Sequence, residues 1–378
     1  RAEGDGRRMK IEEFELERNQ SLYENTVRYN LTESGIHPAA LKDFLTQDEQ
    51  QEVLGLELGY GQTNGDPALR DAIAALYPGY NRDNVLVTNG SAEANFVTIL
   101  NLLERGDEIV VMLPNYMLVW GLARSLGMKV VPFHLREDRD WHIDVAELED
   151  QVSDRTRMIV ICNPNNPTGA VMSEADMAEV ARIAGRVGAY ILSDEIYRGS
   201  ELDGSECLSF HSVYDKPIIL SGLSKAMAHP GLRIGWIAAD KHVVDGCWHC
   251  HDYTSISTGI ISQYAGTRLL EPKRRQEILN RGRSILRKNL DYMCSWIEAR
   301  SDRFSLIPPK AGGMAFVHYR LPINSSELTE GLRREKSVFV VPGDWYGMDN
   351  YLRFGIGCEH DVLAEGLELF DQYINEIG

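Results

Sequence analysis

The chain has 378 residues, 43% of them hydrophobic and 25% charged, a composition typical of a globular protein long enough for two domains. Its 56 acidic residues outnumber its 39 basic residues, so the formal net charge is −17. Nucleic acid and anionic membrane surfaces are therefore poor candidates as partners of this protein.

The N-terminus shows no targeting pattern. No hydrophobic segment follows residues 1–8, which we take as an upstream extension, so we expect no signal peptide and a natural start at Met9. No apolar run reaches the length that spans a membrane. The six cysteines are scattered and do not suggest a disulfide framework, so a cytoplasmic protein is expected.

The middle of the chain alternates short apolar runs with amphipathic stretches. The runs, which are typical of buried strands, are 85–87, 108–112, 129–133, 158–161, 190–192 and 218–220. Residues 91–103 and 174–187 have the spacing of amphipathic helices. This alternation predicts an α/β fold with a large, mostly parallel sheet and helices on both faces. Loops at the strand ends would then carry a site.

From residue 271 the pattern changes to that of a smaller unit. Residues 271–300 predict one long charged helix with an apolar stripe that includes Ile278, Leu286 and Met293. Shorter strands are expected at 304–307, 315–319, 338–341 and 351–356. We therefore predict an N-terminal arm at 1–40 that folds against the small domain, a large domain at 41–270 and a small α+β domain at 271–378.

Lys225 is the most informative residue for function. It follows an apolar run at 217–220, an unusual position for a solvated surface charge. Arg233 lies eight residues later in a glycine-flanked turn and brings a second cation to the same region. An amine and a guanidinium in one closed pocket are what a Schiff base beside a phosphate requires. The pair predicts a pyridoxal-phosphate enzyme.

Three more polar segments follow predicted strands. They are Thr-Asn-Gly-Ser-Ala-Glu-Ala at 88–94, Asn-Pro-Asn-Asn-Pro-Thr-Gly at 163–169 and Ser-Asp-Glu-Ile-Tyr at 193–197. Together with Ser-Gly-Leu-Ser-Lys at 221–225, and in this order, they resemble the fold-type I pyridoxal-phosphate enzymes of the class I/II aminotransferase family. The resemblance runs from about Asn30 to Arg353 and implies pyridoxal 5′-phosphate as the cofactor.

The resemblance implies roles around the cofactor ring. Lys225 would form the Schiff base and then move the proton at the substrate Cα. Asp194 would keep the pyridine nitrogen protonated, while Tyr197 and Asn166 would donate hydrogen bonds to the ring oxygen. Asn166 would also face the substrate. Tyr116 would stack on the ring and fix its plane.

Other matching residues would hold the cofactor phosphate. Ser91 and Ala92 would bind it at a helix N-terminus, where free N–H groups and the helix dipole favour an anion. Arg233 would supply a permanent cation and Ser224 a hydroxyl. Tyr60 resembles a tyrosine that reaches the phosphate from the neighbouring subunit, so the resemblance implies a homodimer with shared active sites.

The same resemblance implies small-molecule partners, an amino acid and a 2-oxo acid. Arg353 would hold the substrate α-carboxylate with its bidentate guanidinium. Gly35, in the N-terminal loop that closes over the substrate, would offer its N–H to the same carboxylate. The side chain would be read by loops of both subunits, including the N-terminal segment and the region of Trp345 and Tyr346.

Some positions depart from the family pattern or suggest other chemistry. Gly222 stands where Ser or Thr often binds the phosphate, so either Ser221 replaces that hydroxyl or one contact is missing. His229 is predicted to be a solvated loop histidine, with a pocket residue as the alternative. Residues 247–251, Cys-Trp-His-Cys-His, look like a haem or metal sequence, but no second ligand cluster lies at metal spacing. We expect a helix there and no metal.

The first hypothesis for function is an aminotransferase that moves the amino group of an L-amino acid to a 2-oxo acid. The alternative keeps the cofactor and changes the reaction to carbon–sulfur lysis, elimination or cyclisation. Residues 29–35 and 221–225 look somewhat like capreomycidine-synthase-type enzymes, which act on hydroxylated arginine derivatives. A third hypothesis is a ligand-sensing regulator, which the acidic charge and the lack of a basic DNA-binding module disfavour.

Overall fold

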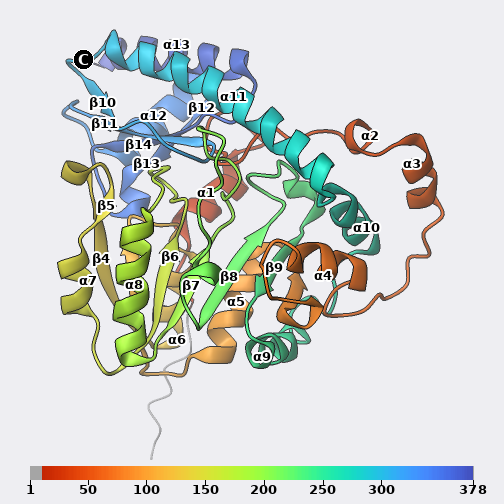
Figure 1. Ribbon diagram of the computed structural model, residues 1–378. Coiled ribbons are helices and arrows are strands. Elements are labelled where there is room, and N and C mark those ends of the chain that lie inside the picture. Colours follow the sequence, from red (N-terminus) through yellow and green to blue (C-terminus); the bar gives the residue numbers. More distant parts are fainter. Residues whose placement is uncertain (1–10, 378) are drawn as a thin grey trace, which may run out of the picture.

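The computed structural model describes residues 11–377, and its centre is a large eight-stranded sheet (Figure 1). The expected start at Met9 lies outside these residues. The strands are β2 (Val85–Thr88), β3 (Glu108–Leu113), β4 (Lys129–Arg136), β5 (His142–Ile143), β6 (Thr156–Cys162), β7 (Tyr190–Asp194), β8 (Pro217–Gly222) and β9 (Gly235–Ala238). Their order is β2-β9-β8-β7-β6-β3-β4-β5. The strands β8, β7, β6, β3 and β4 are parallel, whereas β9 and β5 run antiparallel to their neighbours. The predicted α/β fold is confirmed.

Helices cover both faces of this sheet. The two layers are α5 (Ser91–Leu102), α6 (Leu118–Leu126) and α9 (Lys241–His251) on one side, and α4 (Pro67–Ala74), α7 (Val145–Gln151), α8 (Glu174–Val187) and α10 (Ile260–Leu269) on the other. Strand β3 shows how the sequence produces two cores. Ile109 and Val111 pack against the first layer, whereas Val110 and Met112 pack against the second, because successive strand residues point to opposite faces.

A smaller antiparallel sheet forms the second unit. Its strands are β10 (Phe304–Leu306), β11 (Met314–Tyr319), β14 (Tyr351–Gly355) and β13 (Val341–Pro342), in that order. It is covered by α11 (Pro272–Glu298), α12 (Ser325–Lys336) and α13 (His360–Ile377). The long helix predicted at 271–300 is confirmed as α11. The single strand predicted at 338–341 is wrong, because this stretch changes partner at Val340: β12 (Val338–Phe339) pairs with β1 (Tyr29–Asn30), and β13 pairs with β14.

The N-terminal segment touches both units. Tyr29, Leu31 and Ile36 belong to the core of the small unit, whereas Leu16 of α1 (Glu15–Tyr23) packs into a core of the large sheet. Beyond it, α2 (Leu41–Phe44) and α3 (Gln47–Leu54) project from one side of the molecule (Figure 1). The domain boundaries at 40 and 270 remain predictions. Within residues 11–377, no helix combines the length and apolar character needed to cross a membrane.

Candidate active site

The carboxyl ends of β6, β7 and β8 meet the N-terminus of α5 at a cavity of about 330 Å³. Parallel strands of an α/β sheet present their ligand site at this edge. Ten of the twelve predicted site residues line the cavity: Ser91, Ala92, Tyr116, Asn166, Asp194, Tyr197, Ser224, Lys225, Arg233 and Arg353. The fold therefore gathers residues that are up to 262 positions apart in the chain.

Lys225 lies in the turn after β8 and forms an ion pair that the sequence did not predict. Its Nζ donates to Oε1 of Glu33 at 2.6 Å, and the same oxygen accepts the N–H of Gly35 at 2.6 Å. Burial alone would raise the pKa of Glu33, but the charge and hydrogen bond of Lys225 lower it overall. The amine therefore has an ionised carboxylate as its partner inside the cavity.

Asp194, the last residue of β7, is a carboxyl group with little to stabilise its charge. Burial raises its pKa to about 6, although the N–H of Ile196 at 3.1 Å, the Asn95 side chain and Lys225 act in the opposite direction. A cation against this carboxylate would restore its ionised form. Tyr197 is buried three residues further on, and its hydroxyl lies 2.8 Å from Oγ of Ser34.

Arg353, on β14, is only 1% exposed yet faces the cavity. Its Nη1 donates to Oδ1 of Asn166 at 2.9 Å and to the Tyr346 hydroxyl at 2.6 Å, and its Nη2 donates to the Thr32 carbonyl. Its Nε has no hydrogen-bond partner among the described residues. A buried guanidinium with a free N–H is costly unless a ligand accepts from it, and a carboxylate is the matching acceptor.

The opposite end of the cavity is built for an anion. Gly90 caps α5 with a φ of +83°, so the first N–H groups of the helix, at Ser91 and Ala92, are unpaired within the helix. Arg233 comes so close that a Cβ on Gly90 would lie 2.3 Å from its Nη2. A Cβ on Gly235 would lie 2.3 Å from the Gly90 carbonyl carbon. We call Gly90, Arg233 and Gly235 the glycine corner; it holds a guanidinium against a helix N-terminus, an arrangement whose charge suits a phosphate.

Gly222, which stands where the family often has Ser or Thr, is required at this position for a steric reason. A Cβ at Gly222 would lie 2.7 Å from the Ile234 carbonyl oxygen, so no hydroxyl-bearing side chain fits there. Ser221 does not replace it: its hydroxyl donates to the Glu195 carbonyl at 3.2 Å, and it is not part of the cavity wall. Ser224, which does line the cavity, is the hydroxyl that remains on this segment.

Helix α1 and its C-cap residue Glu24 supply an acidic wall that the sequence reading missed. Glu17, Gln20 and Glu24 line the cavity from one face, and Glu17 accepts the hydroxyl of Tyr116 at 2.5 Å. Burial, followed by repulsion from Glu33 and Glu17, raises the pKa of Glu24. The spacing 17, 20, 24 matches one face of a helix and was the available signal.

Gly35 and Tyr60 do not line this cavity. The Gly35 N–H is occupied by Glu33, although the residue packs within reach of Lys225. Tyr60 is 85% exposed and lies with residues 257–262 on the outside of the chain. This exposure leaves its ring available to another molecule.

Two expectations outside the cavity have clear outcomes. The solvated position predicted for His229 is wrong: the ring is 6% exposed, packs edge-on against Phe44 and does not line the cavity. Burial lowers its pKa. The helix predicted for residues 247–251 is confirmed in α9. Among residues 11–377, no group of three His, Cys, Asp or Glu side chains is placed to hold a metal ion.

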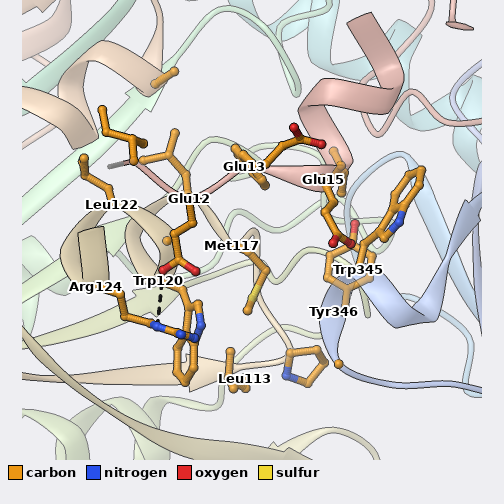
Figure 2. Close-up of a pocket in the computed structure, with 18 of the residues that line it drawn as sticks. Glu12, Glu13, Glu15, Leu113, Met117, Trp120, Leu122, Arg124, Trp345 and Tyr346 are labelled. Atoms are coloured by element: carbon orange, nitrogen blue, oxygen red, sulfur yellow. Dashed lines mark ion pairs between the residues drawn. The ribbon is translucent and has the colours of Figure 1, made fainter. Parts of the chain in front are cut away.

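A second, larger cavity of about 1050 Å³ adjoins the first and shares Leu16 and Ala92 with it. Figure 2 shows its mainly apolar wall, with Met117, Trp120 and Trp345 around it and the ion pair of Glu12 with Arg124 on one side. Trp345 thus faces this space, whereas its neighbour Tyr346 also reaches Arg353.

Pyridoxal 5′-phosphate fits the residues of the smaller cavity. The phosphate would meet the glycine corner, the pyridine nitrogen would supply the cation that Asp194 lacks, and Lys225 lines the same cavity. Arg353, whose Nε has no hydrogen-bond partner among the described residues, lines the same cavity.

Comparisons with known proteins agree with this fit. The sequence profile described as "Aminotransferase class I and II" matches residues 29–370. A pyridoxal-phosphate-dependent aminotransferase structure from Streptococcus suis is 34% identical, with a TM-score of 0.91, over 98% of this chain and 99% of that one. "Aromatic-amino-acid aminotransferase 2" of Thermococcus litoralis is 26% identical over 88% of this chain and 90% of that protein. "Capreomycidine synthase" of Streptomyces vinaceus is 27% identical over 89% and 87%.

Proposed function

Because this chain belongs to the class I and II aminotransferase family and is a pyridoxal-phosphate-dependent transferase, we propose that it moves the amino group of an L-amino acid to a 2-oxo acid. Lys225 would carry the cofactor as a Schiff base. The observation that supports this most is the single cavity in which Lys225, Asp194 and Arg353 face one another. These three groups serve the cofactor aldehyde, the ring nitrogen and the substrate carboxylate.

When bound, pyridoxal phosphate supplies a ring that accepts electrons from the substrate Cα. Ionised Asp194 would hold a proton on the ring nitrogen, and the amide of Asn166 and the hydroxyl of Tyr197 would donate to the ring oxygen. The Asn166 oxygen already accepts from Arg353, which leaves its nitrogen to donate. Tyr116 covers the ring, and its hydroxyl is held by Glu17.

Substrate orientation comes from Arg353. Its bonds to Asn166, Tyr346 and Thr32 fix the guanidinium before any ligand arrives, so little ordering is lost on binding. An amino acid whose carboxylate is held there would share the cavity with Lys225, whose free amine would move the proton at the substrate Cα. The Gly35 N–H becomes available only if Glu33 turns away.

The homodimer, the contribution of Tyr60 to a neighbouring phosphate site and the cytoplasmic location remain predictions. Exposed Leu54, Leu58 and Tyr60 lie on one segment, which agrees with an interface between two copies.

The test of the proposal uses Lys225→Ala. The unaltered protein should be yellow, and one amino acid alone should convert its cofactor stoichiometrically to the amine form. The variant should keep its circular dichroism spectrum but lose the absorbance band that borohydride shifts. Full turnover by Lys225→Ala would refute the proposal.

A second candidate is elimination or cyclisation on the same cofactor, with carbon–sulfur lysis as a variant of it. It is favoured by Glu33, an ionised carboxylate beside Lys225 that could accept a proton from an attacking group of the substrate. The acidic wall of Glu17 and Glu24 would suit a cationic side chain, such as that of a hydroxylated arginine.

Turnover without any 2-oxo acid would favour this second reaction over amino-group transfer. Glu17→Gln and Glu24→Gln should each reduce the preference for arginine over its uncharged analogue citrulline, measured as the ratio of kcat/KM. Glu15→Gln is the matched control, because Glu15 lies on the same helix but is exposed and outside this cavity. An unchanged ratio in all three variants would exclude a role for the acidic wall.

A further inference from the structure

Glu93 is a buried carboxylate that the proposed reaction does not use. It is the third residue of α5, and its side chain is 10% exposed. Oε2 accepts the N–H of Asn89 at 2.6 Å. Oε1 accepts the N–H of Ser255 at 3.2 Å and its hydroxyl at 2.7 Å, and also the hydroxyl of Thr254. One carboxylate therefore joins the turn before α5 to the turn after α9.

His251 packs against this carboxylate. It is the last residue of α9 and of the Cys-Trp-His-Cys-His segment, it is fully buried, and its Nδ1 lies 3.2 Å from Oε1 of Glu93. Burial would raise the pKa of Glu93, but the nearby His251 ring and hydrogen bonds from Thr254, Asn89 and Ser255 lower it to about 2. Glu93 is therefore ionised at neutral pH and accepts charge-assisted hydrogen bonds, which are stronger than neutral ones.

Asn89 connects this pair to the phosphate site. It immediately precedes Gly90, and its carbonyl accepts from Nη2 of Arg233 at 3.5 Å. Both backbone groups of Asn89 are thus held, the N–H by Glu93 and the carbonyl by Arg233. The direction of the next N–H groups, at Ser91 and Ala92, follows from this anchoring, because Gly90 alone would leave the turn free to rotate.

We propose that Glu93 is a positioning residue for the cofactor phosphate. With His251 behind it, it fixes the turn at Asn89 so that the N–H groups at the start of α5 point at the phosphate. The proposal rests on cofactor binding in this cavity, but not on which reaction follows, so it stands or falls independently of amino-group transfer.

The test compares two ligands of the apoenzyme, pyridoxal 5′-phosphate and pyridoxal, in absorbance titrations. Glu93→Ala should weaken pyridoxal phosphate binding at least about tenfold, the equivalent of one lost charge-assisted hydrogen bond. Pyridoxal, which has no phosphate, should bind the variant and the unaltered protein with affinities that differ by less than about twofold. A twofold change in affinity corresponds to less free energy than one weak hydrogen bond. Hydrogen exchange of the amides at 89–92 should also be faster in the variant apoenzyme.

The matched control is Glu147→Ala. Glu147 makes the same kind of contacts, to Nδ1 of His134 at 2.6 Å and to the His134 N–H at 3.1 Å, but lines neither cavity. It should leave the ratio of the two affinities unchanged. If Glu93→Ala does not fold, Glu93→Gln, which keeps an acceptor for Asn89, should show a smaller loss of the same kind. Equal weakening of both ligands, or unchanged or tighter binding of pyridoxal phosphate, would overturn the proposal.

Discussion

Asp194→Asn should stabilise the apoprotein while weakening cofactor binding. Without a cation beside it, the carboxyl group of Asp194 is held in a site that disfavours its charge, and burial raises its pKa to about 6. Asparagine has the same shape and no charge. The variant removes the cost of burying an anion but also removes the partner of the pyridine nitrogen.

The magnitude follows from linkage between proton binding and unfolding. A pKa raised from 3.8 to about 6 means that the native state binds the proton more tightly than the unfolded chain does. Stability is therefore lost as pH rises through this window, and the loss levels off above it. At pH 7.5 the cost is about 3 kcal/mol, and at pH 5 it is about half of that. The asparagine variant should gain these amounts.

The assay is urea unfolding of the apoprotein at pH 5 and pH 7.5, at one protein concentration. Asp215→Asn is the control, because Asp215 is exposed, and it should change neither midpoint. Added pyridoxal phosphate should reverse the order of stability, since only the unaltered protein gains the ion pair with the ring nitrogen. No gain at pH 7.5, or the same gain at both pH values, would refute the reasoning.

Arg353→Ala should raise KM for the amino acid by about 100-fold, because a buried guanidinium–carboxylate contact is worth about 3 kcal/mol. Titration should show that the variant still binds the cofactor. Loss of the cofactor would contradict the assignment of Arg353 to the substrate carboxylate. Gly222→Ala should destabilise the protein by about 1–3 kcal/mol in urea unfolding, since its Cβ would lie 2.7 Å from the Ile234 carbonyl; an unchanged midpoint would mean that β8 and β9 separate easily. Ser221→Ala should change the affinity for pyridoxal phosphate by less than about twofold, because the Ser221 hydroxyl donates to the Glu195 carbonyl and not to the ligand. A larger loss of affinity would place Ser221 at the phosphate.

Much of the fold could be predicted because its strands and helices carry strong local patterns. Helix α8 and helix α11 have long apolar stripes, and the central strands are continuous apolar runs. The exchange of partners at Val340 was missed because nothing local marks it: β12 pairs with β1, about 310 residues away in the chain. Such pairing is fixed by tertiary packing rather than by propensity.

The site residues could be predicted where they belong to motifs of the family that appear in the family's order. They could not be predicted where the site depends on segments that are distant in the chain and meet only in the folded structure. Ten residues of the cavity wall came from the motifs. Glu33 was missed because its partner Lys225 lies 192 residues away. His229 was placed in solvent because it lies in a loop, whereas Phe44, from the segment that projects from the fold, packs against the ring.

The glycine corner has a consequence for how this protein can vary. A methyl group at Gly235 would meet the Gly90 backbone at 2.3 Å, and Gly90 has a φ of +83°, so a side chain at either position is strained. Glu17 and Glu24, in and directly after α1, line the open cavity, where Glu17 accepts the hydroxyl of Tyr116. Substitutions that change substrate specificity are therefore better tolerated on α1 than at the glycine corner. A library of variants randomised on α1 should contain many folded proteins, whereas a library randomised at the glycine corner should contain almost none.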